Sequence, residues 1–159
     1  MPPIIFFLLA ILFATFAIRR KKTKNREKIV EIFLSYLLLF NVGLMGLLAF
    51  VSHIFYPDAT AKAIGWGTGS PFQFEIGMAN LALGVAGVLC FWLRGSFWFA
   101  TILITSILFI GCFVGHLIEY QKGNTAPYNI GPLVWIGDLF IPLLLVILYG
   151  FLARLQRVK

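Results

Sequence analysis

The sequence predicts an all-α integral membrane protein with five transmembrane helices, a four-helix bundle plus a peripheral N-terminal helix. Hydrophobic residues make up 60% of the 159 residues and charged residues only 12%, whereas soluble domains average roughly 45–50% and about 25%. A soluble domain of this size exposes too much surface to hide that excess. We therefore expect one transmembrane domain over residues 1–159, in contact with the lipid bilayer.

The first apolar segment, residues 3–18, is followed directly by Arg19, Arg20, Lys21 and Lys22. A cleavable signal peptide carries its positive charges before the apolar region, so the reversed order favours a membrane anchor. The segment is short for a span, and the alternative is a four-span protein in which it lies on the membrane surface. We prefer five spans, with this one facing lipid.

Four further apolar segments are long enough to cross a bilayer, which takes roughly 20 helical residues. They cover about residues 29–56, 73–93, 97–120 and 133–152. Gly and Pro interrupt regular structure between the second and third spans and between the fourth and fifth spans. These two connecting segments, 58–72 and 121–132, are therefore expected to be irregular loops.

The charge distribution orients this bundle. Of the 13 Lys and Arg residues, all but Lys62 and Lys122 fall at one end of the predicted spans. Cytoplasmic loops carry an excess of Lys and Arg, so we expect the N-terminus outside and the C-terminus in the cytoplasm. The same placement accounts for the net charge of +7 without a nucleic-acid partner. A basic segment of this type also binds anionic lipid head groups, although orientation alone explains it more simply.

Carboxylate and imidazole side chains gather at the outer end of four predicted spans. Ionisable residues within spans are costly, so each is a candidate functional residue. At a rise of 1.5 Å per helical residue, six such residues fall in the outer leaflet or at the outer surface: His53, Asp58, Glu75, His116, Glu119 and Asp138. We predict that they form one cluster at the outer end of the bundle.

Helical periodicity predicts how the spans meet. At 100° per residue, His116 and Glu119 share one face of the fourth span with a polar stripe. Small residues lie on two opposite faces of the third span and allow close helix approach. We therefore expect the third span to be central, with neighbours on both sides, and Gly111 and Gly115 to form a further helix contact.

Three interpretations of the outer cluster remain open. The structural one is that the polar side chains satisfy one another and hold the loops in place. The second is a pocket for a quinone, a sterol-like molecule or another amphiphilic ligand, with aromatic walls and a carboxylate that orients the polar end. Its candidate ligand-binding residues are Glu75, His116, Glu119, Asp138, His53, Asn80, Trp66 and Trp135.

The third interpretation is a transition-metal or proton-handling site. His116 and Glu119 lie one helical turn apart, and imidazole with carboxylates suits iron, manganese or zinc. The candidate metal ligands are His53, Glu75, His116, Glu119 and Asp138. Di-iron bundles use Glu-x-x-His twice, whereas the order here is reversed and occurs once.

These interpretations give the functional alternatives. We favour a non-enzymatic or accessory membrane protein that binds a small amphiphilic ligand, and the sequence assigns no catalytic residue. The alternatives are a metal-dependent membrane oxidoreductase of the di-iron type, or a structural or interaction subunit with a partner in a larger membrane complex.

Several motifs carry a resemblance to known families. They include His53-Ile-Phe-Tyr-Pro57, the segment 70–84 that contains Glu75 and Asn80, Gly115-His116-x-x-Glu119 and Asp138-x-x-x-Pro142. Over roughly residues 30–150 the chain resembles a family of small uncharacterised bacterial inner-membrane proteins. This resemblance implies a multi-pass protein of the bacterial inner (cytoplasmic) membrane.

A looser similarity runs to the DoxX-like membrane proteins, four-helix bundles with an acidic residue early in a helix that follows a Pro/Gly-rich outer loop. Glu75 is the residue that matches that pattern. Some members of that group accompany quinone-linked oxidation and distant relatives bind sterol-like ligands. This similarity implies a ligand pocket near Glu75, while the additional N-terminal span departs from the four-helix pattern.

Overall fold

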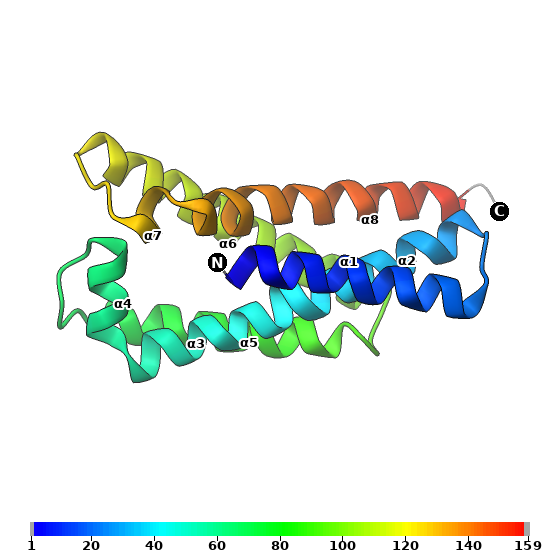
Figure 1. The fold of residues 1–159 in the computed structure, drawn as a ribbon, viewed down its shortest axis with the longest axis horizontal. Helices are drawn as coiled ribbons and strands as arrows, with labels where there is room; N and C mark the ends of the chain where they lie inside the picture. Colours follow the sequence, from blue (N-terminus) through cyan, green and yellow to red (C-terminus); the bar gives the residue numbers. More distant parts are fainter. Residues whose placement is uncertain (1, 158–159) are drawn as a thin grey trace.

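The structure is a computed structural model that describes residues 2–157. Over these residues it is a bundle of helices (Figure 1). In chain order they are α1 (Pro2–Lys21), α2 (Arg26–Leu37), η1 (Leu38–Leu44), α3 (Met45–Phe55), α4 (Pro57–Ile64), α5 (Phe72–Leu89), α6 (Ser96–Gln121), α7 (Pro127–Ile130), η2 (Leu133–Phe140) and α8 (Ile141–Arg157). The segments η1 and η2 are π-helical.

Five helical segments are long and apolar enough to cross a membrane, which confirms the predicted span count. They are Pro2–Lys21, Arg26–Phe55, Phe72–Leu89, Ser96–Gln121 and Pro127–Arg157. The predicted third span continued to residue 93, but the helix ends at Leu89 and a turn follows. Gly95 has a φ of 65° directly before α6, a conformation that glycine adopts without the steric cost of a side chain.

The spans form two groups that meet at one end of the molecule and separate toward the other (Figure 1). One group pairs α5 with η1 and α3, and the other pairs α6 with η2 and α8. At the end where α8 finishes, α2 packs on α8. We call this the basic end, because the last turns of α1 and α8 there contain Arg19, Arg20, Lys21, Arg154 and Arg157. At the opposite end α4 packs on α7, and we call it the capped end.

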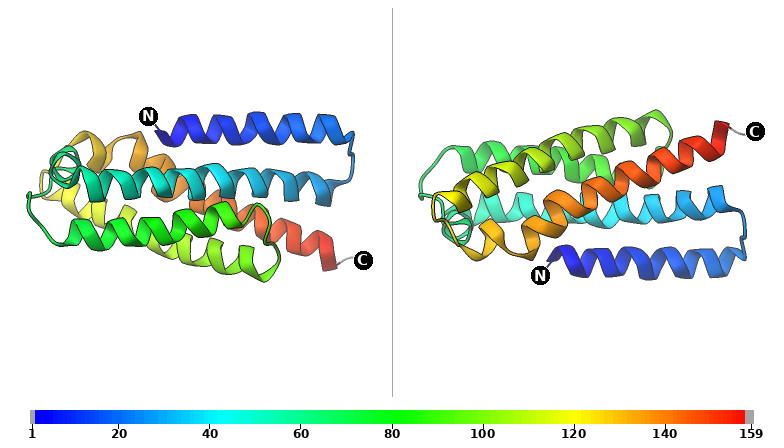
Figure 2. Two further views of the ribbon diagram at one scale, coloured as in Figure 1. Left: turned by 90° about the horizontal axis from the view of Figure 1, so that it is seen from below. Right: turned by 90° about the horizontal axis from the view of Figure 1, so that it is seen from above.

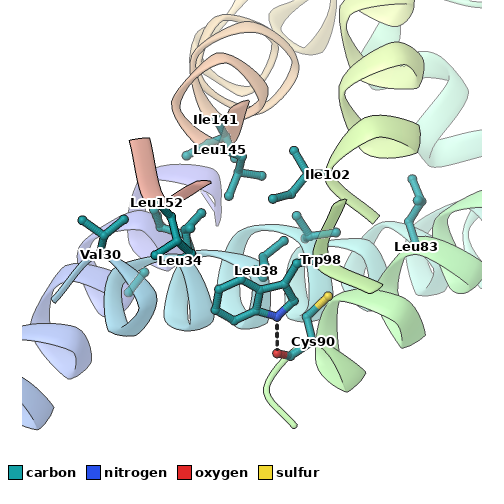
Figure 3. Packing of buried hydrophobic residues seen from close by; sticks show 13 residues of the cluster. Val30, Leu34, Leu38, Leu83, Cys90, Trp98, Ile102, Ile141, Leu145 and Leu152 are labelled. Atoms are coloured by element: carbon teal, nitrogen blue, oxygen red, sulfur yellow. Dashed lines mark hydrogen bonds between the residues drawn. The ribbon is translucent and has the colours of Figure 1, made fainter. Parts of the chain in front are cut away.

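The buried core lies where the two groups meet (Figure 3). Leu34 and Leu38 of the second span pack there with Leu145 of α8, and each is fully buried. Trp98 of α6 is 1% exposed and donates from Nε1 to the backbone oxygen of Cys90 at 2.7 Å. This core joins the two groups near the basic end and leaves them free to diverge beyond it.

Close backbone contact joins the second and third spans. A Cβ atom on Gly46 would lie 2.9 Å from the Cα atom of Gly84, and one on Gly87 would collide with the backbone of Gly43. These glycines therefore allow the helices to approach as the small-residue pattern predicts. On the opposite face of α5 Ala82 is exposed, whereas Ala79 and Ala86 are half-buried, and α5 also contacts α6. The small residues of that face therefore do not form a close helix contact along their whole length.

Gly111 and Gly115 of α6 also differ from the prediction. Both are exposed, and a Cβ atom at either position would meet no atom of the described chain within 4 Å. This GxxxG pair therefore makes no helix contact within residues 2–157. Its face of α6 is left open because α6 packs through its other side on η2 and α8.

The N-terminal helix α1 lies at the edge of the bundle and ends short of the capped end (Figure 2). It packs along α2 and η1, with ring contacts that include Phe13 on Phe40 at 5.5 Å. Its first residues also reach η2. The helix thus lies against both the second and the fifth spans near the middle of the molecule.

Candidate functional site

A cavity of about 340 Å³ occupies the space between the diverging spans. It is lined by α1, η1, α3, α5, α6 and η2 and by residues of the capped end. Pro2 and Pro3 of α1 and Ile141 of α8 are also among the lining residues. Its volume falls in the range of small-molecule sites, about 300–1,000 Å³. The cavity exists because the core holds the spans together only at the basic end.

Both π-helical segments contribute polar side chains to this cavity. η1 contributes Asn41 and η2 contributes Asp138, and both residues are among those that line the cavity. A π-helical turn inserts an extra residue into the helix, and such segments occur frequently at functional sites. The inserted residues shift the side chains that follow around the helix axis, so faces drawn at 100° per residue do not hold across η1 and η2.

An imidazole and a carboxylate face each other on the cavity wall. His116 of α6 has its Nε2 atom 3.7 Å from Oδ2 of Asp138, and the two side chains are 11% and 14% exposed. This separation exceeds that of a hydrogen bond between nitrogen and oxygen. The pair therefore retains hydrogen-bonding capacity toward a third group in the cavity.

Asn129 fixes the orientation of the His116 ring. Its Nδ2 atom donates to the backbone oxygens of His116 at 3.2 Å and Asn124 at 2.8 Å, so its Oδ1 atom faces Nδ1 of His116 at 2.8 Å. An amide oxygen only accepts hydrogen bonds, so Nδ1 carries a proton and donates it. The proton-accepting atom of the neutral ring is then Nε2, the one that faces Asp138.

The capped end closes over this pair. The ring of Trp66 stacks on His116 with centroids 6.2 Å apart and an interplanar angle of 8°, and it also contacts Phe72. Asn124 donates from Nδ2 to the backbone oxygen of Ile64 at 3.0 Å. These contacts tie the loop after α4 to the segment before α7, and they explain why His116 is only 11% exposed.

His53 lies between the cavity and a second hollow at the surface of the capped end. That hollow measures about 330 Å³ and is also lined by Asp58 and Gln73. His53 lines both spaces, and its Nδ1 atom lies 2.7 Å from Oε1 of Gln73. Asp58 accepts from the backbone nitrogen of Gly69 at 3.1 Å, which holds the loop between α4 and α5. His53 is therefore part of the partition between the two spaces.

The structure brings together five of the predicted ligand-binding residues and separates three. The cavity is lined by His53, Trp66, Asn80, His116 and Asp138. Glu75 is exposed in the first turn of α5 and lines neither space. Glu119 forms a surface ion pair with Lys122 at 2.8 Å, and Trp135 is 46% exposed against Phe113. The predicted single cluster therefore loses Glu75 and Glu119. The rise of a helix predicts the depth of a residue in the bundle, but it does not predict the direction in which the side chain points.

The proposed metal ligands do not assemble. Among residues 2–157 no group of three or more His, Cys, Asp and Glu side chains could hold a metal ion. His116 and Asp138 supply only two donors, whereas zinc sites in proteins use at least three protein ligands. Glu75 and Glu119 point elsewhere, so the arrangement does not fit the iron, manganese or zinc shell that the sequence suggested.

Four residues of the site were not singled out for it from the sequence. Asn129 positions His116, Gln73 contacts His53, and Asn41 and Cys112 line the cavity. The sequence contains a signal that could have identified Asn41 as a site residue, since Asn41 is the only strongly polar residue in a long apolar stretch of the second span. For Asn129 and Gln73, which lie beside Pro- and Gly-rich loops, the partner was decided by the tertiary structure.

Comparison with known proteins identifies a family but no activity. A family described as of unknown function, DUF6790, matches residues 1–158 and so includes the first span. No curated protein and no solved structure matches the chain.

Proposed function

We propose that this chain, which belongs to the DUF6790 family of unknown function, is a membrane protein that binds a small amphiphilic molecule in the cavity between its spans. The observation that carries this proposal is the cavity of about 340 Å³ with the pair of His116 and Asp138 on its wall. Apolar cavities with a few converging polar groups are the usual form of small-molecule sites.

The chemistry of the wall favours a ligand with one polar end. Around the pair the lining is largely apolar and includes Leu48, Ile76 and Phe109, which suits a hydrocarbon or ring system. The wall offers hydrogen-bond acceptors to this end, among them Nε2 of His116 and the carboxylate of Asp138, and each has capacity for a further hydrogen bond. A sterol-like molecule or a related lipid with a hydroxyl group meets this description, whereas a quinone supplies only hydrogen-bond acceptors.

The exposure of the cavity wall supports entry from the bilayer. Leu48 of α3 lines the cavity and is 39% exposed within the second span. An amphiphile dissolved in the membrane would reach the cavity at this wall. Such entry requires no passage through the polar loops of the capped end.

We further propose that the capped end faces the outside of a bacterial inner membrane. Among the Lys and Arg side chains of residues 2–157, only Lys62 and Lys122 lie near that end, and the positive-inside rule then places the basic end in the cytoplasm. The similarity to DoxX-like proteins remains a prediction of the sequence. Glu75, the residue on which it rests, is exposed outside the cavity.

Saturable binding of a defined amphiphile tests the proposal. The protein is reconstituted in nanodiscs and titrated with tritiated 4-hexylphenol, and the binding to empty nanodiscs is subtracted. We expect saturable binding that is lost in Cys112→Phe, because Cys112 lines the cavity and the larger side chain fills it. The matched control is Val114→Phe on the same helix, since Val114 is 49% exposed and lies outside the cavity.

The outcome separates the alternatives. Binding that does not saturate, or that is equal in Cys112→Phe and Val114→Phe, would contradict a ligand site and favour the structural interpretation of the polar residues. Saturable binding lost only in Cys112→Phe assigns the ligand to the cavity.

A further inference from the structure

Asn41 is a buried amide with an unused hydrogen-bonding atom. The residue is 3% exposed and lines the cavity. Its Nδ2 atom donates to the backbone oxygen of Pro3 over a long 3.4 Å, while Oδ1 has no hydrogen-bond partner among the described residues. A buried polar group without a partner costs free energy. This arrangement is therefore incomplete in the protein alone.

The position of Asn41 in the bilayer increases that cost. It lies in the middle of the second span, about 20 Å from each end at 1.5 Å per residue. Water is absent from the hydrocarbon region, and a polar residue at this depth is a functional-site candidate by default. Other buried polar atoms without partners, such as the hydroxyl of Thr105, do not line the cavity. Among these residues, Asn41 is the one that lines the cavity.

We infer that the amide oxygen of Asn41 selects ligands that carry a hydrogen-bond donor, a hydroxyl or N–H group on an apolar body. This inference rests on the proposed function and adds the chemical class of the ligand. An amide oxygen accepts and does not donate, so an ether or a ketone at the same place leaves it unpaired. The π-helical turn of η1 that contains Asn41 presents the amide at this position.

The test compares two probes that differ in one donor, 4-hexylphenol and its methyl ether 4-hexylanisole. The dissociation constants of both probes are measured in the same nanodiscs for the wild type and for Asn41→Leu. The preference is the ratio of the two dissociation constants, and differences in lipid partitioning cancel when the preference is compared between the two proteins. We expect the preference for the phenol over the ether to fall about fivefold in Asn41→Leu, the value of one ordinary hydrogen bond. Thr105→Val is the matched control, because it removes a buried unpaired hydroxyl outside the cavity.

Each result decides between the two proposals. Saturable binding of both probes with the same preference in the wild type and Asn41→Leu overturns the role of Asn41 and leaves the cavity site intact. Saturable binding of neither probe to the wild type overturns the proposed function. If Asn41→Leu does not give monodisperse protein, Asn41→Ala makes the same comparison without adding bulk against Pro3.

Discussion

The indole of Trp66 lies nearly parallel to the imidazole of His116, with 8° between the rings and 6.2 Å between their centroids. Trp66 belongs to the loop after α4, and His116 to the last third of α6. The stacking therefore connects a loop of the capped end to the polar pair on the cavity wall. It limits both the exposure and the rotation of the imidazole.

Trp66→Ala should loosen this connection. The substitution removes the stacking on His116 and the contact with Phe72, and we expect a loss of about 1–2 kcal/mol in the free energy of unfolding. Thermal unfolding in detergent measures the loss, and limited proteolysis within residues 65–71 should become faster. Trp92→Ala is the control, since Trp92 is 67% exposed and should change stability by less than about 0.5 kcal/mol. Equal effects of the two substitutions would contradict the role of the stacked pair.

Asp138→Asn and Glu119→Gln should differ in ligand binding. Asp138 lies 3.7 Å from His116 on the cavity wall, whereas Glu119 pairs with Lys122 at the surface. We expect Asp138→Asn to weaken saturable 4-hexylphenol binding about fivefold, because it replaces one acceptor oxygen of the cavity wall with an NH2 group. Glu119→Gln should leave binding unchanged, because an exposed ion pair contributes little. If Glu119→Gln abolished binding, the assignment of the site to the cavity would be wrong.

Asn129→Ala should disturb the capped end. Asn129 is fully buried and makes three hydrogen bonds, to the His116 ring and to the backbone oxygens of His116 and Asn124. Its removal leaves buried groups without partners, at about 1–3 kcal/mol for each. We expect a clear fall in the thermal unfolding midpoint, whereas Thr125→Ala, at a nearby exposed position, should leave it nearly unchanged. A stable Asn129→Ala protein would show that the ring of His116 is held by other contacts.

Gly87→Ala and Gly115→Ala should differ although both add one methyl group to a membrane helix. A Cβ atom at Gly87 collides with the backbone of Gly43, and backbone atoms cannot rotate away. We expect a loss of stability of about 1–3 kcal/mol, the usual cost of overpacking. Gly115 faces open space, so Gly115→Ala should have no measurable effect on the isolated chain. Thermal unfolding of both variants in the same detergent makes the comparison, and the reverse order would refute the packing of α5 on the second span.

The close approach of the second and third spans illustrates what a sequence pattern can predict. Small residues at Gly77, Gly84 and Gly87 recur at helical spacing, and they do form the contact face of α5. The same pattern at Gly111 and Gly115 predicted a contact that is absent within residues 2–157. Spacing shows that a close approach is sterically allowed, but the long-range packing decides whether another helix is there.

The polar site shows the same division. The sequence placed His116 and Asp138 at one depth, and the structure brings them to 3.7 Å. It placed Glu75 and Glu119 at that depth as well, yet both lie outside the cavity. The rise of a helix gives depth to within a turn, but the direction of a side chain depends on helix rotation. The π-helical turns of η1 and η2 shift that rotation in two of the five spans.

The composition and the lengths of the apolar segments by themselves determined the membrane class and the five spans. An apolar segment long enough to cross the bilayer avoids water, and its helix satisfies the backbone polar groups in lipid, and both properties depend only on local sequence. Only the tertiary structure decided that the spans meet at the basic end and diverge toward the capped end. That divergence creates the cavity, and it arises from the packing of Leu34, Trp98 and Leu145, residues more than forty positions apart (Figure 3). Contacts between such distant residues leave no periodic signal in the chain.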